Sequence, residues 1–286
     1  MGKVFLNSGI VDEAQACVSA LDSGFLYGLG LFETMRAVGG EVFALDDHLA
    51  RLAASAVALQ VQNPYEKSFL ADAVRQTLEA NSLQEARVRL TLSGGPMNAE
   101  PPAATLFVTA TGLDSYPKEC YEKGVTAVIS DYRQNPQDPA TGHKTISFFS
   151  RLLALREAHC KHATEALWFT PQGLLAEGCI SNVFIVRDST LFTPKRETPV
   201  MPGVARKHIL RLAGTLGIGA EERDLTVSDL LKADEVFVSN VIMLLLPVVA
   251  VEAHAVGEGR PGPVTKKLLE AFRGLVQPKG TAAGGN

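Results

Sequence analysis

A polar stretch near the middle of the chain, residues 112–124, most constrains how this sequence can fold. It contains Pro117 and separates two runs with the composition of β-strands, residues 105–111 and 125–130. Proline and clustered polar residues interrupt both helices and sheets. The strands on the two sides of this stretch are therefore expected to belong to different domains.

The length of the chain agrees with such a division, because 286 residues leave room for two domains of medium size. We predict an N-terminal domain over residues 1–117 and a C-terminal domain over residues 118–286. The last residues, 278–286, are rich in Gly, Ala and Thr and are predicted to form a flexible tail.

The first domain has the sequence pattern of a small mixed α/β layer. Residues 35–43 are typical of a β-hairpin that turns at Gly39-Gly40. A helix is predicted to follow, with Asp46 as its N-cap and with apolar residues spaced three and four apart. The other elements predicted for this domain are a helix over residues 66–80 and strands over residues 88–93 and 105–111.

The second domain is richer in strands. Two long helices are predicted, one over residues 147–162 and one that begins near Gly203 and stops at Gly217. Short runs of strand-forming residues, separated by turn residues, surround these helices. The strands are predicted over residues 125–130, 166–169, 183–187, 191–193, 235–239 and 248–251.

Charge and hydropathy exclude several classes of function. The net charge of -4 and the pI near 5.9 leave no basic stripe for nucleic acid. The longest apolar run, residues 241–251, is too short to span a bilayer, and the N-terminus has no targeting pattern. We therefore expect a cytoplasmic protein that acts on a small-molecule substrate, without a nucleic-acid or membrane partner.

No metal site is expected either. The four cysteines lie far apart and lack the spacing of metal ligands or of redox pairs. His159 and His162 are three apart on a predicted helix, but no set of carboxylates or thiols accompanies them. We interpret the cysteines as reduced thiols and the histidines as solvated or structural residues.

Four segments, taken in order, carry the chemistry of the chain: residues 21–36, residues 47–52, Lys144 ahead of residues 154–158, and residues 176–184. Together they resemble the class IV aminotransferase family, the fold-type IV enzymes that use pyridoxal 5'-phosphate (PLP), over nearly the whole chain. The resemblance implies an α/β fold with a small mixed α/β layer domain and a larger strand-rich pseudo-barrel domain. It also implies a homodimer.

Lys144 is the residue with the most specific role in this resemblance. On composition alone, a lysine among polar neighbours is expected to be exposed and without function. The resemblance implies instead that Lys144 holds the cofactor aldehyde as a Schiff base and moves the proton at the substrate carbon. Both tasks require an amine whose pKa is lowered, because an ammonium is neither a nucleophile nor a base.

Glu177 has two interpretations. As an isolated residue it is a turn carboxylate next to a short predicted strand. The resemblance implies that it faces the ring nitrogen of PLP. A fixed carboxylate there favours the protonated ring, which makes the cofactor an electron sink.

The cofactor phosphate needs hydrogen-bond donors and positive charge, and a helix N-terminus supplies both. The helix predicted to begin near Gly203 provides such an N-terminus. By resemblance, the amides of Val204 and Ala205 cradle the phosphate, and Arg51 adds a charge-assisted contact.

Three further cofactor contacts are implied by the resemblance. Asn240 and Val241 match a second phosphate-contacting turn, although most relatives carry Ser or Thr there. Met201 matches a residue that packs against the ring face of the cofactor, and an ordinary core methionine is the alternative. Phe148 and Phe149 stand where many relatives have tyrosine near the lysine, so the partner of the cofactor O3' is not identified.

Binding of the substrate carboxylate distinguishes the subgroups of the family, since an anion in a partly dry pocket needs a specific cationic partner. Residues 96–100 lack the Arg-x-His motif of D-amino-acid aminotransferases. Residues 84–86 lack the tyrosine of the Tyr-x-Arg pattern of branched-chain aminotransferases. The candidate substrate residues are Phe32, Arg87 and Arg89, of which the two arginines share one face of a predicted strand.

Three functions follow from these patterns. Residues 25–34 and 87–95 most resemble 4-amino-4-deoxychorismate lyases, which release 4-aminobenzoate and pyruvate in folate synthesis. The alternative is a class IV aminotransferase of branched-chain or D-amino acids. A PLP-binding protein without catalysis is the third, and the presence of both Lys144 and Glu177 disfavours it.

Overall fold

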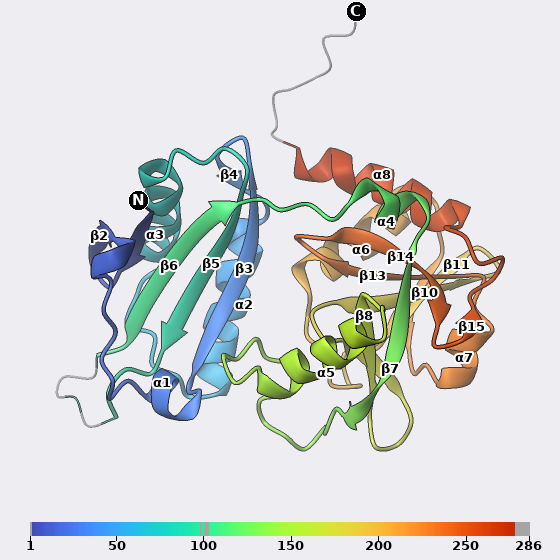
Figure 1. Ribbon diagram of the computed structural model, residues 1–286, viewed down its shortest axis with the longest axis horizontal. Helices are drawn as coiled ribbons and strands as arrows, with labels where there is room; N and C mark the ends of the chain where they lie inside the picture. The colour runs from blue at the N-terminus through green and yellow to red at the C-terminus, as the bar shows by residue number, and fades with distance from the viewer. Residues whose placement is uncertain (1, 98, 100–102, 278–286) are drawn as a thin grey trace, which may run out of the picture. The chain divides into compact units, whose positions relative to one another are not determined.

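The computed structural model describes residues 2–97, 99 and 103–277 and divides the chain into two units (Figure 1). Unit 1 consists of residues 1–114, 143–147 and 276–286, and unit 2 consists of residues 115–142 and 148–275. The short segment that contains Lys144 therefore belongs to unit 1, although it follows the polar stretch in sequence. The predicted tail, residues 278–286, lies outside the described residues.

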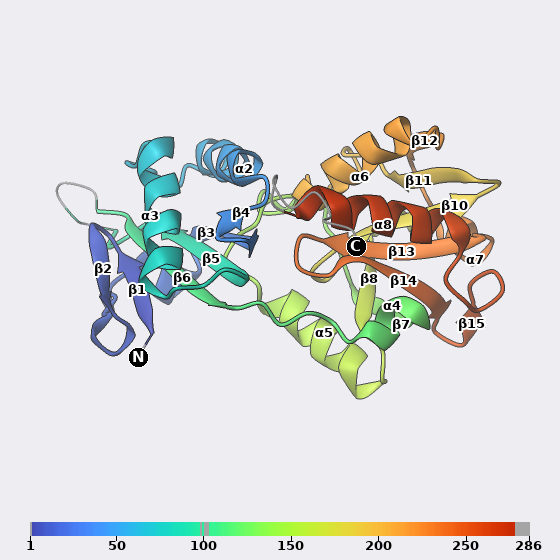
Figure 2. The same cartoon turned by 90° about the horizontal axis from the view of Figure 1, so that it is seen from above.

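Unit 1 is built on an antiparallel sheet of six strands in the order β2-β1-β6-β5-β3-β4. The helices α2 (Leu45–Ala58) and α3 (Lys67–Ala80) lie against this sheet (Figure 2), and their apolar residues form one core with it. The strands are β1 (Lys3–Leu6), β2 (Gly9–Asp12), β3 (Gly30–Val38), β4 (Glu41–Val42), β5 (Ala86–Ser93) and β6 (Thr105–Gly112), and α1 spans Ser23–Tyr27.

The predicted hairpin is confirmed, but the predicted start of the helix after it is wrong. Gly39 and Gly40 both have positive φ, 62° and 77°, as a two-residue hairpin turn requires. The helix begins at Leu45 after Ala44, so Asp46 lies in the first turn instead of capping it. The hairpin continues to Phe43, whose N–H donates to the carbonyl oxygen of Arg36 at 2.9 Å. Because the helix starts only two residues later, no extended residue at position 46 can precede it as a cap.

Unit 2 is built on a mixed sheet in the order β12-β11-β10-β13-β14-β7-β8-β9, with β15 paired to β14. The strands β9 (Leu175–Gly178) and β10 (Asn182–Arg187) stand far apart in this order, yet residues 179–181 alone connect them. The sheet must therefore curl back on itself, and the predicted strand-rich pseudo-barrel and α/β fold class are confirmed. The other strands are β7 (Val125–Arg133), β8 (Glu165–Phe169), β11 (Thr190–Pro194), β12 (Ala220–Arg223), β13 (Glu235–Asn240), β14 (Leu244–Val251) and β15 (His254–Ala255).

Helices border this sheet, and two of them match the predicted long helices. They are α4 (Lys118–Glu122), α5 (Phe149–Cys160), α6 (Val204–Thr215), α7 (Val227–Leu231) and α8 (Pro263–Val276). Within the described ranges, no helix combines the length and the apolar composition that a bilayer crossing requires.

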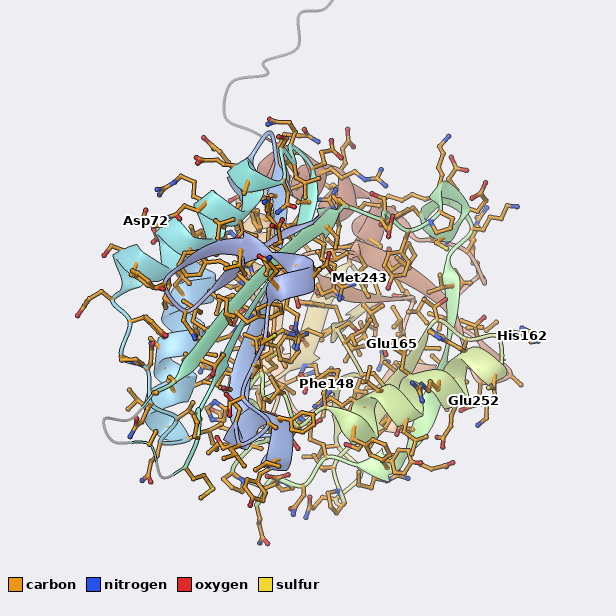
Figure 3. All side chains as sticks on the ribbon, turned by 60° about the vertical axis from the view of Figure 1, so that its left-hand side comes forward. Asp72, Phe148, His162, Glu165, Met243 and Glu252 are labelled. Atoms are coloured by element: carbon orange, nitrogen blue, oxygen red, sulfur yellow. The ribbon has the colours of Figure 1, made fainter. Side chains whose placement is uncertain are left out.

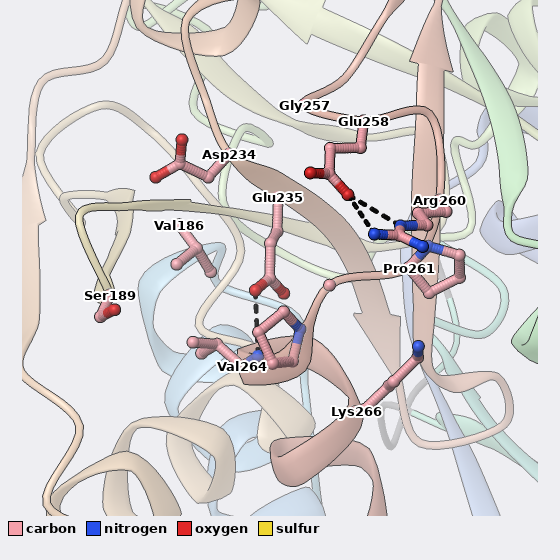
Figure 4. A pocket seen from close by; sticks show the side chains of 12 residues that line it. Val186, Ser189, Asp234, Glu235, Gly257, Glu258, Arg260, Pro261, Val264 and Lys266 are labelled. Atoms are coloured by element: carbon pink, nitrogen blue, oxygen red, sulfur yellow. Dashed lines mark hydrogen bonds and ion pairs between the residues drawn. The ribbon is translucent and has the colours of Figure 1, made fainter.

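Glu235, at the start of β13, holds the beginning of α8. Its side chain is buried, and its carboxylate accepts the N–H group of Val264 at 2.9 Å (Figure 4) and that of Thr265 at 2.7 Å. These amides belong to the first turn of the helix, where the backbone offers no acceptor of its own. A cavity of about 600 Å³ beside this contact is lined by polar groups such as Asp234 and Glu258.

We expect Glu235→Ala to lower the free energy of unfolding by about 2 kcal/mol, because it leaves the buried amide of Thr265 and the part-buried amide of Val264 without an acceptor. Urea unfolding followed by the fluorescence of Trp168, the single tryptophan and a residue of unit 2, measures the change. Glu258→Ala is the matched control, since the ion pair of Glu258 with Arg260 is exposed and should contribute little. Equal effects of the two substitutions would contradict the capping role.

Candidate functional site

Lys144 lies in the short segment of unit 1 that is attached to the edge of β3. The Phe32 N–H donates to the carbonyl oxygen of Lys144 at 2.9 Å, and Thr145 forms an antiparallel bridge with Leu31. The backbone at Lys144 is therefore fixed by pairing to a sheet before the chain enters α5. The pairing therefore fixes the position of the Lys144 Cα, from which the long side chain extends.

The ring of Phe32 lies close to two cations. The Nζ of Lys144 is 4.5 Å from the ring centroid, and the guanidinium carbon of Arg89 is 3.8 Å from it. Arg89 is half-buried, and its burial, together with the charge of Arg87, lowers the pKa of its guanidinium. The structure thus brings Lys144, Phe32 and Arg89 together, whereas Arg87 on the same strand is exposed.

Arg51 is paired with a buried carboxylate, Glu33 of β3, that no sequence motif singled out. The Nε of Arg51 donates to one oxygen of Glu33 at 2.8 Å, and its Nη2 donates to the other at 2.5 Å. His48 contributes a third hydrogen bond, from Nδ1 at 2.7 Å. Because a carboxylate only accepts, His48 carries a proton on Nδ1.

Burial and pairing shift the pKa values of both Glu33 and His48. Burial alone raises the pKa of Glu33, but the Arg51 charge and the hydrogen bonds from His48 and Arg51 lower it to about 2. Burial lowers the pKa of the His48 imidazole against the opposing effect of Glu33. At neutral pH Glu33 is an anion and His48 is neutral, so Arg51 is a rigidly held cation with a largely buried side chain.

Glu177 lies in β9 of unit 2 and is buried. Its Oε1 accepts hydrogen bonds from Arg151 at 2.6 Å and from Gln134 at 3.1 Å, and its Oε2 accepts the Met201 N–H at 2.9 Å. A carboxylate offers about four acceptor positions. Glu177 can therefore accept one more donor, at Oε2, which suits the protonated nitrogen of an aromatic ring.

The N-terminus of α6 has the form of an anion site. Gly203 precedes the helix, and the amides of Val204 and Ala205 open its first turn. A Cβ at Gly203 would lie 1.9 Å from Oδ1 of Asn182, so only glycine fits there. The Asn182 amide in turn donates to the carbonyl of Met201 at 3.0 Å, which fixes the chain just ahead of the helix.

The Asn240 side chain closes the turn after β13. Its Oδ1 accepts the N–H groups of Ile242 and Met243, both at 2.8 Å, and its Nδ2 donates to the carbonyl of Ile180 at 3.0 Å. Val241 is buried. Since the Asn240 side chain is used within the turn, the phosphate contacts predicted for Asn240 and Val241 depend on backbone groups and stay predictions.

The histidines of α5 do not form a site. His162 lies just beyond the end of the helix and is exposed (Figure 3). Among the residues for which side chains are described, no group of three His, Cys, Asp or Glu residues could hold a metal ion. Cys179 is buried, and burial raises the pKa of its thiol to about 12.

Comparison with known proteins identifies the relatives of the chain. The family profile described as amino-transferase class IV matches residues 30–251. A putative branched-chain-amino-acid aminotransferase of Methanocaldococcus jannaschii is 34% identical over 96% of this chain and 96% of its own length. A D-alanine aminotransferase of Staphylococcus haemolyticus is 30% identical over 98% of this chain and 99% of its own length.

Two solved structures have the same fold. The branched-chain amino acid aminotransferase of Escherichia coli superposes with a TM-score of 0.92 at 29% identity, covering 98% of this chain and 97% of its own. A second branched-chain amino acid aminotransferase, solved with pyridoxamine 5'-phosphate, superposes with a TM-score of 0.91 at 26% identity, covering 96% of this chain and 94% of its own.

The Glu33 and His48 ionisations predict that the protein loses stability in acid. The His48 pKa is lowered from 6.5, so its contribution to stability is lost as the pH falls below that value. The Glu33 pKa is about 2 instead of 4.5, so its contribution is complete above pH 4.5 and is lost towards pH 2. This second loss amounts to at most about 3 kcal/mol.

The measurement is the free energy of unfolding as a function of pH. In Glu33→Gln the loss between pH 4.5 and 2 should be largely absent, while Glu41→Gln, an exposed carboxylate of the same unit, should keep the wild-type profile. A Glu33→Gln profile identical to that of the wild type would show that the pair does not set the acid stability.

Proposed function

We propose that this chain, which belongs to the class IV aminotransferase family, transfers an amino group between an aliphatic amino acid and a 2-oxo acid. The observation that carries the proposal is the full-length similarity to the putative branched-chain-amino-acid aminotransferase at 34% identity. The named relatives support the aminotransferase alternative better than the lyase that the sequence patterns favoured. The cofactor is PLP, in keeping with the relative solved with pyridoxamine 5'-phosphate.

The described residues fit this cofactor. The paired guanidinium of Arg51 and the first amides of α6 suit a phosphate dianion, since both supply donors and positive charge. Glu177 is buried and can accept one further N–H, as a protonated ring nitrogen requires. Lys144 supplies the amine that holds the aldehyde.

When bound, PLP supplies an electron sink for the charge that forms at the substrate carbon. The residues of the chain have three tasks beside it. Glu177 keeps the ring nitrogen protonated, and Arg51 holds the phosphate. Lys144 takes the proton from the substrate carbon and returns it to another carbon, which requires its amine in the neutral form.

Arg89 is our candidate for the substrate carboxylate. Its guanidinium is half-buried beside the Phe32 ring, and Lys144 reaches the same ring. A partly desolvated arginine binds a carboxylate more strongly than an exposed one does. Residues 96–100 lack the Arg-x-His motif of D-amino-acid enzymes, and residues 84–86 lack the tyrosine of the branched-chain pattern. The choice of an L-amino acid with a branched aliphatic side chain therefore rests on the similarity to the putative branched-chain-amino-acid aminotransferase. The lyase is the second candidate, favoured by the resemblance of residues 25–34 and 87–95.

The reaction is tested with the PLP-loaded enzyme and one amino acid at a time. We expect L-leucine to convert the cofactor rapidly to its amino form, which is measured by the change in absorbance. The rate with D-alanine should be lower by a factor of about one hundred or more. Lys144→Ala should not react. Release of 4-aminobenzoate and pyruvate from 4-amino-4-deoxychorismate, with L-leucine inert, would show that the protein is the lyase.

The role of Arg89 in binding the substrate carboxylate is tested in the same assay by comparing two variants. Arg89→Leu should raise the KM for L-leucine at least about tenfold, since it removes a charge-assisted contact. Arg87→Leu, two residues along the strand and exposed, should leave the KM near the wild-type value. Equal KM values in the two variants would exclude Arg89 as the carboxylate partner.

We also propose that the protein is a homodimer, as expected from the family resemblance. Apolar side chains on and beside α1 support this: Leu21, Phe25, Leu26, Tyr27 and Leu29 are each between 41% and 75% exposed. Monomeric proteins rarely expose so many neighbouring apolar groups. In a dimer with two-fold symmetry, this surface of one subunit packs against the same surface of the other subunit.

Light scattering should give about twice the chain mass of 30.5 kDa for the wild type. Phe25→Asp should shift the protein towards the monomer, because it places a charge within the apolar surface around α1. Val57→Asp changes an equally exposed apolar residue of α2, outside that surface, and should remain dimeric. A monomeric wild-type protein would contradict the proposal.

A further inference from the structure

Arg151, near the start of α5, is the centre of the polar network around Glu177. Its Nη2 donates to Oε1 of Glu177 at 2.6 Å and to Oε1 of Gln134 at 2.9 Å. Its Nη1 donates to the carbonyl oxygens of Gly178 at 3.0 Å and Cys179 at 3.3 Å. The four hydrogens of the two terminal nitrogens are therefore all donated, within unit 2.

The surroundings of Arg151 restrict its guanidinium to one orientation. The Arg151 side chain is 16% exposed and that of Glu177 is 2% exposed, so solvent screens the pair weakly. The rings of Trp168 and Phe148 lie 5.3 Å and 6.0 Å from the guanidinium carbon. A lysine could not replace this contact set, because its single ammonium cannot donate to four acceptors from two fixed nitrogens.

The consequence concerns the two oxygens of Glu177. Oε1 accepts from both Arg151 and Gln134, which fills its acceptor positions. Oε2 accepts from the Met201 amide alone among the described donors. The network therefore distinguishes two oxygens that are chemically equivalent in an unrestrained carboxylate.

We propose that Arg151 is a positioning residue, which directs Oε2 of Glu177 to the N–H of the cofactor ring by occupying Oε1. The inference rests on the proposed function, in which Glu177 faces the ring nitrogen. Without Arg151 the carboxylate loses its charge partner and can rotate, so that neither oxygen is held ready for the ring. The effect of Arg151 is therefore specific for a cofactor that has an N–H to donate.

That specificity gives a direct test by cofactor binding. PLP is compared with its 1-deaza analogue, in which a C–H replaces the ring nitrogen while the aldehyde and phosphate are kept. The wild-type protein should bind PLP about tenfold more tightly than the analogue, or more, as expected for a hydrogen bond to a charged group. In Glu177→Gln this preference should fall towards one.

Arg151→Met should lose the preference in the same way, with little change in the affinity for the analogue, and Arg151→Lys should retain part of it. The matched control is Arg223→Met, since Arg223 also lies over an aromatic ring, that of Phe192, and pairs with Asp229. It should keep the wild-type preference. Circular dichroism tests whether each variant is folded. If Arg151→Met does not fold, Arg151→Lys takes its place, and a preference for PLP over the analogue equal to that of the wild type in Arg151→Lys overturns the proposal.

Two other outcomes also overturn it, and they are distinguishable. If Arg151→Met weakens binding of PLP and of the analogue equally, Arg151 supports the fold and does not position Glu177. If Glu177→Gln keeps the wild-type preference, the assignment of Glu177 in the proposed function is itself wrong, and the inference about Arg151 falls with it.

Discussion

A carboxylate that is removed from water must be compensated by hydrogen-bond donors and by positive charge, and this requirement shapes both units of the protein. In unit 1, Arg51 and His48 compensate Glu33 through three hydrogen bonds. In unit 2, Arg151 is the only cation among the three donors that compensate Glu177 within the described residues. Each arginine is oriented by its carboxylate, and each carboxylate by its arginine, so the fold itself fixes both ion pairs.

Glu165 shows what happens when such a carboxylate has no arginine. It is fully buried in β8 (Figure 3), and burial raises its pKa although neighbouring amides and the Ser181 hydroxyl donate to it. These donors come from the turn that follows Glu177, so Glu165 braces that turn. At Gly178 a Cβ would lie 2.7 Å from the Glu165 carboxyl carbon, and glycine is required there. Glu165 therefore supports the backbone, whereas Glu177 is paired with the guanidinium of Arg151.

The sequence was sufficient for elements with local signals, such as the Gly39-Gly40 hairpin and the two long helices of unit 2. The roles of Lys144 and Glu177 rest on the match of their segments to a family pattern, and they stay predictions. The Asp46 cap failed because the length of the preceding hairpin decides where that helix starts. The role of Arg151 could not be predicted, since its partners lie in separate segments that only the curled sheet brings together. The helix α8 had a usable signal, Pro263 at its first position followed by spaced apolar residues.

The choice between amino-group transfer and lyase chemistry does not depend on these charge clusters. In the roles that we propose for them, Lys144 takes a proton and Glu177 maintains the electron sink in both reactions, so either reaction would preserve the same two residues. They differ in the molecules that the site binds in turn. An aminotransferase binds an amino acid, releases the corresponding 2-oxo acid and then binds a second 2-oxo acid. Each of these molecules carries a carboxylate next to the reacting carbon. A single cation held in place can serve all of them, and the guanidinium carbon of Arg89 lies 3.8 Å from the centroid of the Phe32 ring, while its Nε donates to the Thr91 hydroxyl at 3.2 Å. One half-buried arginine thus suits the exchange of small carboxylates, in agreement with the similarity to the named aminotransferases, because of which we place amino-group transfer first.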